Sequence, residues 1–184
     1  YTDYAYLAEP GDKAVQDLNR GDYAGAMAYW EEAYKRAPEM PLVHKVQGDI
    51  FYSRKRWDQA IPAYQRAITL GSDSPGARLN LVWAFVEQQR YQEAYAMGAK
   101  FIQEGVTLPD MYRRVAEACF RGKMFAESIP FFEKAVSGFQ NDLYLMEHMR
   151  QAYSASGNRT KAAEMQTRIE QAQARIEGVK GGGQ

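Results

Sequence analysis

The chain has 184 residues and equal numbers of basic and acidic residues, 23 of each, so its formal net charge is zero. A general phosphate-backbone binder needs a basic excess to displace counterions, and this balance excludes that class. Hydrophobic residues make up 46% of the chain, which excludes a chain that is disordered by composition. A single cysteine, Cys119, excludes both an intramolecular disulfide framework and a multi-cysteine zinc site.

The composition favours helices over strands. The chain has 26 Ala but only 21 Val, Ile and Thr together, and Ala loses no side-chain entropy in a helix. No stretch approaches 18 uncharged apolar residues, so we expect no membrane-spanning helix. The sequence shows no signal peptide and starts at Tyr1 rather than Met, so we expect a processed or truncated form. Its compartment stays open between the cytoplasm and the periplasm.

A period of 34 residues runs through the chain. Small residues recur at this spacing, and an aromatic residue stands three positions before each of the first four. The small residues are Ala26, Ala60, Ala94, Ser128 and Ala162. The aromatic residues are Tyr23, Trp57, Tyr91 and Phe125, with Arg159 in the fifth position. The prolines of a third series are Pro41, Pro75 and Pro109. Because independent positions share one period, we infer an array of repeats.

Each repeat divides into two amphipathic helices, as residues 41–74 show. Pro41 suits the first turn of a helix, and apolar residues follow it at spacings of three and four. A second apolar series with the same spacings starts at Trp57, and Asp58 is its expected N-cap. Gly71 is expected to end this second helix. The pattern therefore predicts a helix pair in every repeat.

These residues resemble the tetratricopeptide repeat family, whose units are 34 residues long. The matching pieces of the family pattern are Gly48-x2-Phe51, Ala26-x3-Trp30, Ala60-x3-Tyr64 and Pro38. The resemblance implies an all-α fold, a right-handed α-solenoid of antiparallel helix pairs. It covers about nine-tenths of the chain and does not distinguish between members of the family.

The period sets the expected organisation of the chain. We expect an N-terminal arm at residues 1–6, the array at 7–176 and a flexible Gly-rich tail at 177–184. The five repeats are 7–40, 41–74, 75–108, 109–142 and 143–176. Gly178 is expected to stop the last helix.

The fifth repeat carries polar residues at positions that are normally buried, namely Arg150, Arg159 and Gln166. A terminal repeat needs a polar outer face, so we expect its second helix to cap the array. A short dimer seam along Met165–Ile176 is the alternative interpretation of this helix.

The resemblance also implies that the first helix of each repeat lines a concave groove, commonly a peptide-binding surface. The corresponding positions are Lys45, Asp49 and Tyr52 in the second repeat, Leu79, Asn80, Trp83 and Glu87 in the third, Arg113, Arg114, Glu117, Phe120 and Arg121 in the fourth, and His148 and Gln151 in the fifth. Trp and Arg are frequent interface anchors, although Trp83 would also suit simple packing between neighbouring helices.

One subgroup of the family holds a peptide's C-terminal carboxylate with Lys, Asn and Arg side chains. Lys45, Asn80 and Arg114 resemble three of its five positions, but Asp49 and Asp110 occupy the other two, where Asn and Lys are expected. Two carboxylates would repel a bound carboxylate. We therefore favour a partner that carries both signs of charge.

The sequence predicts no catalytic, cofactor or metal site. His44 and His148 lie in different repeats, and no His, Cys or carboxylate set has metal-ligand spacing. The only run of glycines, Gly181–Gly183, lacks the strand context of a phosphate-binding loop. Cys119 falls in the core series with Phe51, so we interpret it as a buried hydrophobic residue rather than a nucleophile.

We therefore predict a non-enzymatic adaptor or scaffold that binds a peptide or partner protein in the concave groove, with no cofactor, no nucleic acid and no direct membrane insertion. The alternative is a self-assembling structural module of a larger complex, of the secretion, pilus or envelope assembly type. Such a module would associate by end-to-end stacking, by the last helix or by the aromatic-rich Tyr1–Leu7 arm. A homo-oligomer is thus an open alternative that the sequence does not favour.

Overall fold

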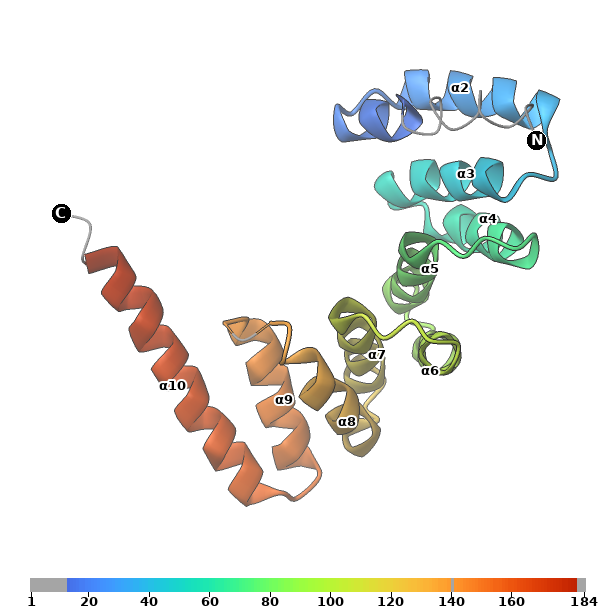
Figure 1. Ribbon diagram of the computed structural model, residues 1–184. Coiled ribbons are helices and arrows are strands. Elements are labelled where there is room, and N and C mark those ends of the chain that lie inside the picture. The colour runs from blue at the N-terminus through green and yellow to red at the C-terminus, as the bar shows by residue number, and fades with distance from the viewer. Residues whose placement is uncertain (1–12, 140, 182–184) are drawn as a thin grey trace. The chain divides into compact units, whose positions relative to one another are not determined.

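The computed structural model describes residues 13–139 and 141–181, and every regular element within these ranges is an α-helix (Figure 1). This confirms the predicted all-α class. The chain forms two compact units, Tyr1–Gln88 and Gln89–Gln184. The helices of the first unit are a helix that includes residues 13–19, α2 (Tyr23–Arg36), α3 (Pro41–Ser53), α4 (Trp57–Thr69) and α5 (Pro75–Glu87). Those of the second unit are α6 (Tyr91–Gln103), α7 (Pro109–Arg121), α8 (Phe125–Ala135), α9 (Leu143–Ala155) and α10 (Arg159–Gly181).

The helix starts follow the prolines and the aromatic series. Pro41, Pro75 and Pro109 are the first residues of α3, α5 and α7, as predicted. The expected N-cap of α4 is wrong, because the helix already begins at Trp57 and Asp58 lies inside its first turn. A carboxylate in this position favours the helix through its macrodipole rather than through a cap hydrogen bond.

The helix ends show where a glycine stops a helix and where it does not. Gly71 follows α4 with a φ of 97°, in the left-handed region that favours glycine, and the Ser72 amide donates back to the Ala67 carbonyl at 2.9 Å. The stop expected at Gly178 is wrong, because α10 continues through it to Gly181. A glycine that keeps helical dihedrals weakens a helix without ending it. Residues 182–184 of the predicted tail and the predicted arm at 1–6 lie outside the described residues.

The first unit packs its helices in sequential pairs, with α3 in contact with α2, α4 and α5. Its buried residues include Val46 and Ile50 of α3 and Leu81 of α5, each at most 2% exposed. Tyr64 of α4 is fully buried, and its ring packs closely against α3 at Gly48. A Cβ atom at Gly48 would stand 2.6 Å from the Tyr64 ring, so this close approach requires glycine.

The second unit has one larger hydrophobic cluster, which spans α7, α8, α9 and α10. Its fully buried members include Phe132 of α8 and Leu145 of α9. Cys119 is also fully buried, as predicted, and burial raises the pKa of its thiol to about 12. The thiol therefore stays protonated at neutral pH, as expected of a core residue.

Candidate partner-binding surfaces

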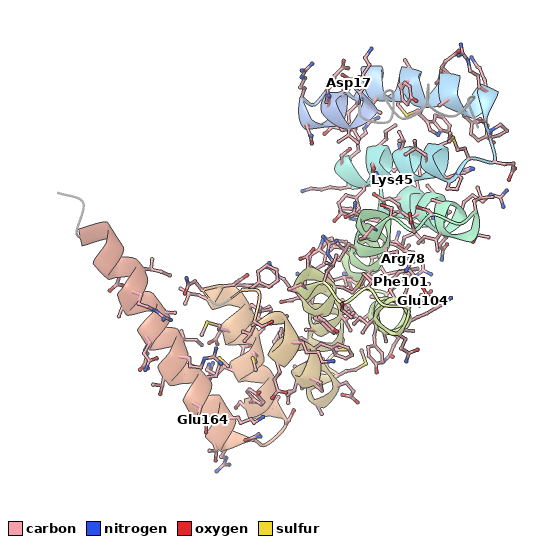
Figure 2. All side chains as sticks on the ribbon, in the orientation of Figure 1. Asp17, Lys45, Arg78, Phe101, Glu104 and Glu164 are labelled. Carbon is pink, nitrogen blue, oxygen red and sulfur yellow. The ribbon has the colours of Figure 1, made fainter. Side chains whose placement is uncertain are left out.

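The first candidate surface lies in the first unit and is formed by α3 and α5, which contact each other. We call it the α3–α5 surface, and its residues are Lys45, Asp49, Tyr52, Leu79, Asn80, Trp83 and Glu87. Residues 45, 49 and 52 are three and four positions apart, so they share one face of α3. All seven are half-buried except Glu87, which is exposed. Figure 2 shows Lys45 on α3.

A hydrogen-bond network anchored on a buried tyrosine fixes the polar part of this surface. Lys45 Nζ lies 2.6 Å from Asp49 Oδ2, and Tyr64 Oη donates to Asp49 Oδ1 at 2.7 Å. Asn80 Nδ2 in turn donates to Tyr64 Oη at 3.1 Å. Burial, followed by the neighbouring Asp49 carboxylate, raises the pKa of the Tyr64 phenol, so the phenol keeps its proton. The network therefore joins α3, α4 and α5, with the Tyr64 hydroxyl as donor to Asp49 and acceptor from Asn80.

This network bears on the carboxylate-binding pattern considered in the sequence. The structure brings Lys45 and Asn80 to the same network, but the Lys45 ammonium is already neutralised by Asp49. Arg114 belongs to the other unit, where its Nε lies 3.1 Å from Asp110 Oδ2. Asp49 and Asp110, which depart from the family pattern, thus form ion pairs with the two cations that would otherwise hold a peptide carboxylate. The contacts argue against capture of a free C-terminus.

The second candidate surface lies in the second unit on α7 and α9, which also contact each other. We call it the α7–α9 surface, and its predicted residues are Arg113, Arg114, Glu117, Phe120, Arg121, His148 and Gln151. Gln151 is exposed and the others are half-buried, with one exception. The Glu117 side chain is only 1% exposed, so our expectation that it lines an open groove is wrong. Its burial follows from the packing of α9 over this part of α7.

The buried Glu117 carboxylate organises the centre of the α7–α9 surface. His148 Nδ1 lies 2.9 Å from Glu117 Oε1, and Arg121 Nε lies 3.6 Å from Oε2. The His148 ring stacks on Phe120, with ring centroids 4.4 Å apart and an angle of 17° between the planes. The Tyr144 ring also contacts the imidazole, with ring centroids 4.0 Å apart. Glu117 thus holds in place a histidine that is 15% exposed and contacts two aromatic rings.

The arginines of this surface are held by acids of the same unit. Arg113 lies 3.3 Å from Asp142 and places its guanidinium over the Phe139 ring, 5.1 Å from the centroid. Arg114 pairs with Asp110, as described above. These contacts limit the number of side-chain conformations and leave about a third of the Arg113 side chain exposed. Ion pairs therefore hold the Arg113 and Arg114 guanidinium groups in place while both side chains stay partly exposed to solvent.

Two residues that shape these surfaces are missing from the sequence-based set. Tyr144 is 51% exposed and lies four residues before His148, on the same face of α9. Its spacing from His148 is a signal that could have identified it. Tyr64 is a core position by its pattern, and nothing local in the sequence shows that its hydroxyl reaches a surface formed by two other helices.

Across 13–139 and 141–181, no group of three or more His, Cys, Asp or Glu side chains is arranged to hold a metal ion. In the same ranges, none of the helices is long and apolar enough to cross a membrane. His44, the other histidine of the sequence, is buried, and its Nε2 lies 2.7 Å from the Pro38 carbonyl oxygen.

Comparison with known proteins places the chain in a family. A family model described as tetratricopeptide repeat matches residues 12–75 and 56–105, which together span half of the chain. Among solved structures, the chain is similar to a double mutant of MamA RS-1, with 15% identity, a TM-score of 0.81, and 96% of this chain and 98% of that chain covered. It is also similar to residues 41 to the end of MamA from Desulfovibrio magneticus RS-1, with 16% identity, a TM-score of 0.79, and 94% and 97% covered. No curated protein sequence matches. The two structural similarities show a shared helical-repeat fold.

Proposed function

Because the chain belongs to the tetratricopeptide repeat family, we propose that it is a non-enzymatic adaptor that binds a peptide or partner protein through the α3–α5 and α7–α9 surfaces. The fold supports a protein-interaction scaffold, since repeats of this type stack helices and present long surfaces of aligned side chains. The two candidate surfaces extend this to particular residues of the chain.

The observation that carries the proposal is the His148 stack on α7 and α9. Tyr144 is exposed beside an imidazole that is fixed by Phe120 and by the buried Glu117 carboxylate. Rigid aromatic groups lose little conformational entropy when a partner covers them, which makes them efficient anchors. Arg113 lies one turn before Glu117 on α7, and its guanidinium is held by Asp142. A fixed aromatic group and a positioned cation on one surface suit a partner segment that offers an apolar or aromatic side chain and an acidic one.

The charge pattern of the α3–α5 surface supports a partner of mixed charge. Lys45 and Asp49 neutralise each other, and Glu87 adds an exposed carboxylate at the far end of α5. A partner with a single sign of charge would leave one of these groups opposite a like charge, which is unfavourable. The local mixture therefore favours a segment with both acidic and basic residues.

The proposal is tested by capture followed by substitution. The full chain serves as bait, a captured protein is identified and purified, and its affinity is measured against Tyr144→Ser. We expect the affinity to fall about tenfold or more, because truncation of an anchor costs on the order of 2 kcal/mol.

Tyr34→Ser is the matched control, because Tyr34 is also an exposed tyrosine, at 43%, and lies on α2 outside both surfaces. It should bind within about twofold of the unchanged chain, since surface positions outside an interface contribute little. Equal affinities for the two variants would show that the α7–α9 surface is not the binding site.

A further inference from the structure

The two nitrogens of the His148 imidazole lie in different surroundings. Nδ1 is turned to the buried Glu117 carboxylate, 2.9 Å from Oε1. Nε2 has no hydrogen-bond partner among the described residues, and it is not one of the described side-chain atoms that are buried without a partner. The side chain is 15% exposed, and Phe120 and Tyr144 contact its ring. Nε2 is therefore the polar atom through which this histidine can bind a partner.

The chemical role of Nε2 depends on the number of protons that Glu117 and His148 hold together. A single proton on Nδ1 leaves the pair with a net negative charge and leaves a lone pair on Nε2. With two protons, the pair is neutral overall. The 2.9 Å contact between Nδ1 and Oε1 accommodates one hydrogen, on either atom, so the other hydrogen lies on Nε2. Nε2 is then a donor, whichever of the two atoms holds the shared proton.

The burial of Glu117 favours the neutral pair. The carboxylate is 1% exposed, and its Oε2 accepts no hydrogen bond from a described residue. A buried charge is unfavourable unless it is both paired and hydrogen-bonded. Arg121 Nε lies 3.6 Å from Oε2, which is longer than a hydrogen bond, and water screens its charge because about a third of the side chain is exposed. A second proton on Oε2 itself would point at this guanidinium, which is also a donor, so the proton belongs on Nε2.

The charged neighbours of His148 leave room for an anion at Nε2. Glu147, which precedes His148 on α9, is paired with Arg150 at 2.6 Å. Arg113 lies on the same surface and keeps about a third of its side chain exposed. A carboxylate from a partner would thus meet a hydrogen-bond donor and a cation on this surface. Neither Glu147 nor the neutral Glu117–His148 pair would repel it with an uncompensated negative charge.

We propose that His148 Nε2–H donates a hydrogen bond to a carboxylate of the partner, and that Glu117 is the positioning residue that keeps the hydrogen on Nε2. This inference rests on the proposed function, because it assigns a role within the α7–α9 surface. An apolar side chain beside the partner's acidic residue packs on the exposed Tyr144 ring. The imidazole then lies between two carboxyl groups, one from each protein. A hydrogen bond to a charged acceptor is about twice as strong as a neutral one, so the contact selects an acidic segment.

The protonation of Nε2 can be measured without any partner. Long-range proton–nitrogen correlation NMR of the isotope-labelled full chain distinguishes protonated from unprotonated imidazole nitrogens, and His148→Gln identifies the His148 signals. We expect Nε2 to carry a hydrogen at neutral pH. His44 is the internal reference, because its Nε2 lies 2.7 Å from the Pro38 carbonyl oxygen and must donate to it. An unprotonated Nε2 on His148 would overturn the proposal, because its lone pair would repel a carboxylate.

The contact with a carboxylate is tested with a phage-displayed library of random dodecapeptides, selected on the full chain. Peptides that lose binding to Tyr144→Ser bind at the α7–α9 surface. We expect them to contain Asp or Glu, and replacement of this residue by Asn or Gln should weaken binding about tenfold or more. The same replacement should matter less than about twofold on a chain that combines Glu117→Gln with His148→Phe. This variant keeps an aromatic ring on Phe120 but lacks the Nε2 hydrogen.

Gln151→Ala is the matched control, because Gln151 is exposed and lies three residues after His148 on the same face of α9. The acid-to-amide replacement in the peptide should weaken binding to Gln151→Ala as much as binding to the unchanged chain. Circular dichroism checks the helix content of each variant, and the NMR measurement decides the proposal if the double variant does not fold.

The outcomes separate this inference from the proposed function. Selection of no peptide that depends on Tyr144 would overturn both. Tyr144-dependent peptides that tolerate the acid-to-amide replacement, or that lose as much affinity for the double variant as for the unchanged chain, would overturn the inference alone. The surface would then still bind a partner, but without a carboxylate at His148.

Discussion

Asp49 and Glu117 are the two carboxylates at the centres of the α3–α5 and α7–α9 surfaces, yet their side chains are 16% and 1% exposed. In the first unit the buried member of the network is Tyr64, a neutral phenol, and the charges of Lys45 and Asp49 keep contact with water. In the second unit the carboxylate itself is buried, and its partners His148 and Arg121 lie nearer the surface. The same helix positions thus support two different electrostatic designs.

The difference predicts different roles for the polar groups of the two units. Loss of a partner on the α3–α5 surface leaves groups that water can solvate. Loss of His148 leaves the buried Glu117 carboxylate with Arg121 at 3.6 Å as its remaining partner, which is more costly. We therefore expect substitutions on the α7–α9 surface to lower the free energy of unfolding more than substitutions on the α3–α5 surface.

The largest expected effect is that of His148→Ala. Removal of the imidazole leaves the Glu117 carboxylate buried with Arg121 3.6 Å away as a poorer partner. Breaking a buried pair typically lowers the free energy of unfolding by about 3–5 kcal/mol. Urea denaturation followed by circular dichroism measures the change.

Two further variants separate the charge from simple packing. Gln151→Ala lies one turn along the same face of α9 and is exposed, so it should change the free energy of unfolding by no more than about 0.5 kcal/mol. Glu117→Gln, added to His148→Ala, removes the buried charge and should recover part of the loss. If His148→Ala costs no more than Gln151→Ala, Glu117 does not depend on the histidine.

The helices and their inward faces could be predicted because they are local properties of the sequence. Pro41, Pro75 and Pro109 start helices for reasons of backbone geometry, and Cys119 falls in an apolar series. The burial of Glu117 could not be predicted, because it depends on a helix that begins 26 residues later. The hydroxyl contact of Tyr64 with Asn80 is likewise a property of three packed helices. What the sequence misses is therefore the pairing of polar groups across helices.

A second, smaller effect is expected for Gly48→Ala in the first unit. The new Cβ would stand 2.6 Å from Tyr64 ring carbons, and the ring is fully buried, so ring or helix must shift. Overpacking of this kind typically lowers the free energy of unfolding by about 1–3 kcal/mol. The shift also moves the Tyr64 hydroxyl away from Asp49 and Asn80, and the change is measured by urea denaturation.

Gly76→Ala is the matched control, because we expect it to leave the free energy of unfolding unchanged or to raise it. Gly76 lies in the first turn of α5, and its Cβ would meet only Ser74 Oγ at an ordinary 3.7 Å. Ala there should be neutral or stabilise by up to about 1 kcal/mol, because glycine is the poorer helix former. Equal effects at the two positions would contradict the tight fit of Tyr64 on α3.

The smallest effect sharpens the contrast between buried and exposed carboxylates on the α7–α9 side. Glu147 forms an ion pair with Arg150 at 2.6 Å, and the Arg150 hydrogen bonds lower the pKa of this carboxyl to about 2. Because the folded-state pKa lies below the unfolded value of about 4.3, the pair stabilises the fold above that pH and loses its contribution as the pH falls toward 2. Both side chains are about a third exposed, so solvent screening limits the contribution to about 0.3–0.5 kcal/mol.

Glu147→Gln should therefore slightly reduce the pH dependence of the free energy of unfolding between about pH 4 and pH 2. It should leave the destabilisation caused by His148→Ala unchanged. Urea denaturation of both chains across this range measures the difference, and an identical pH profile would show that the ion pair contributes nothing in solution.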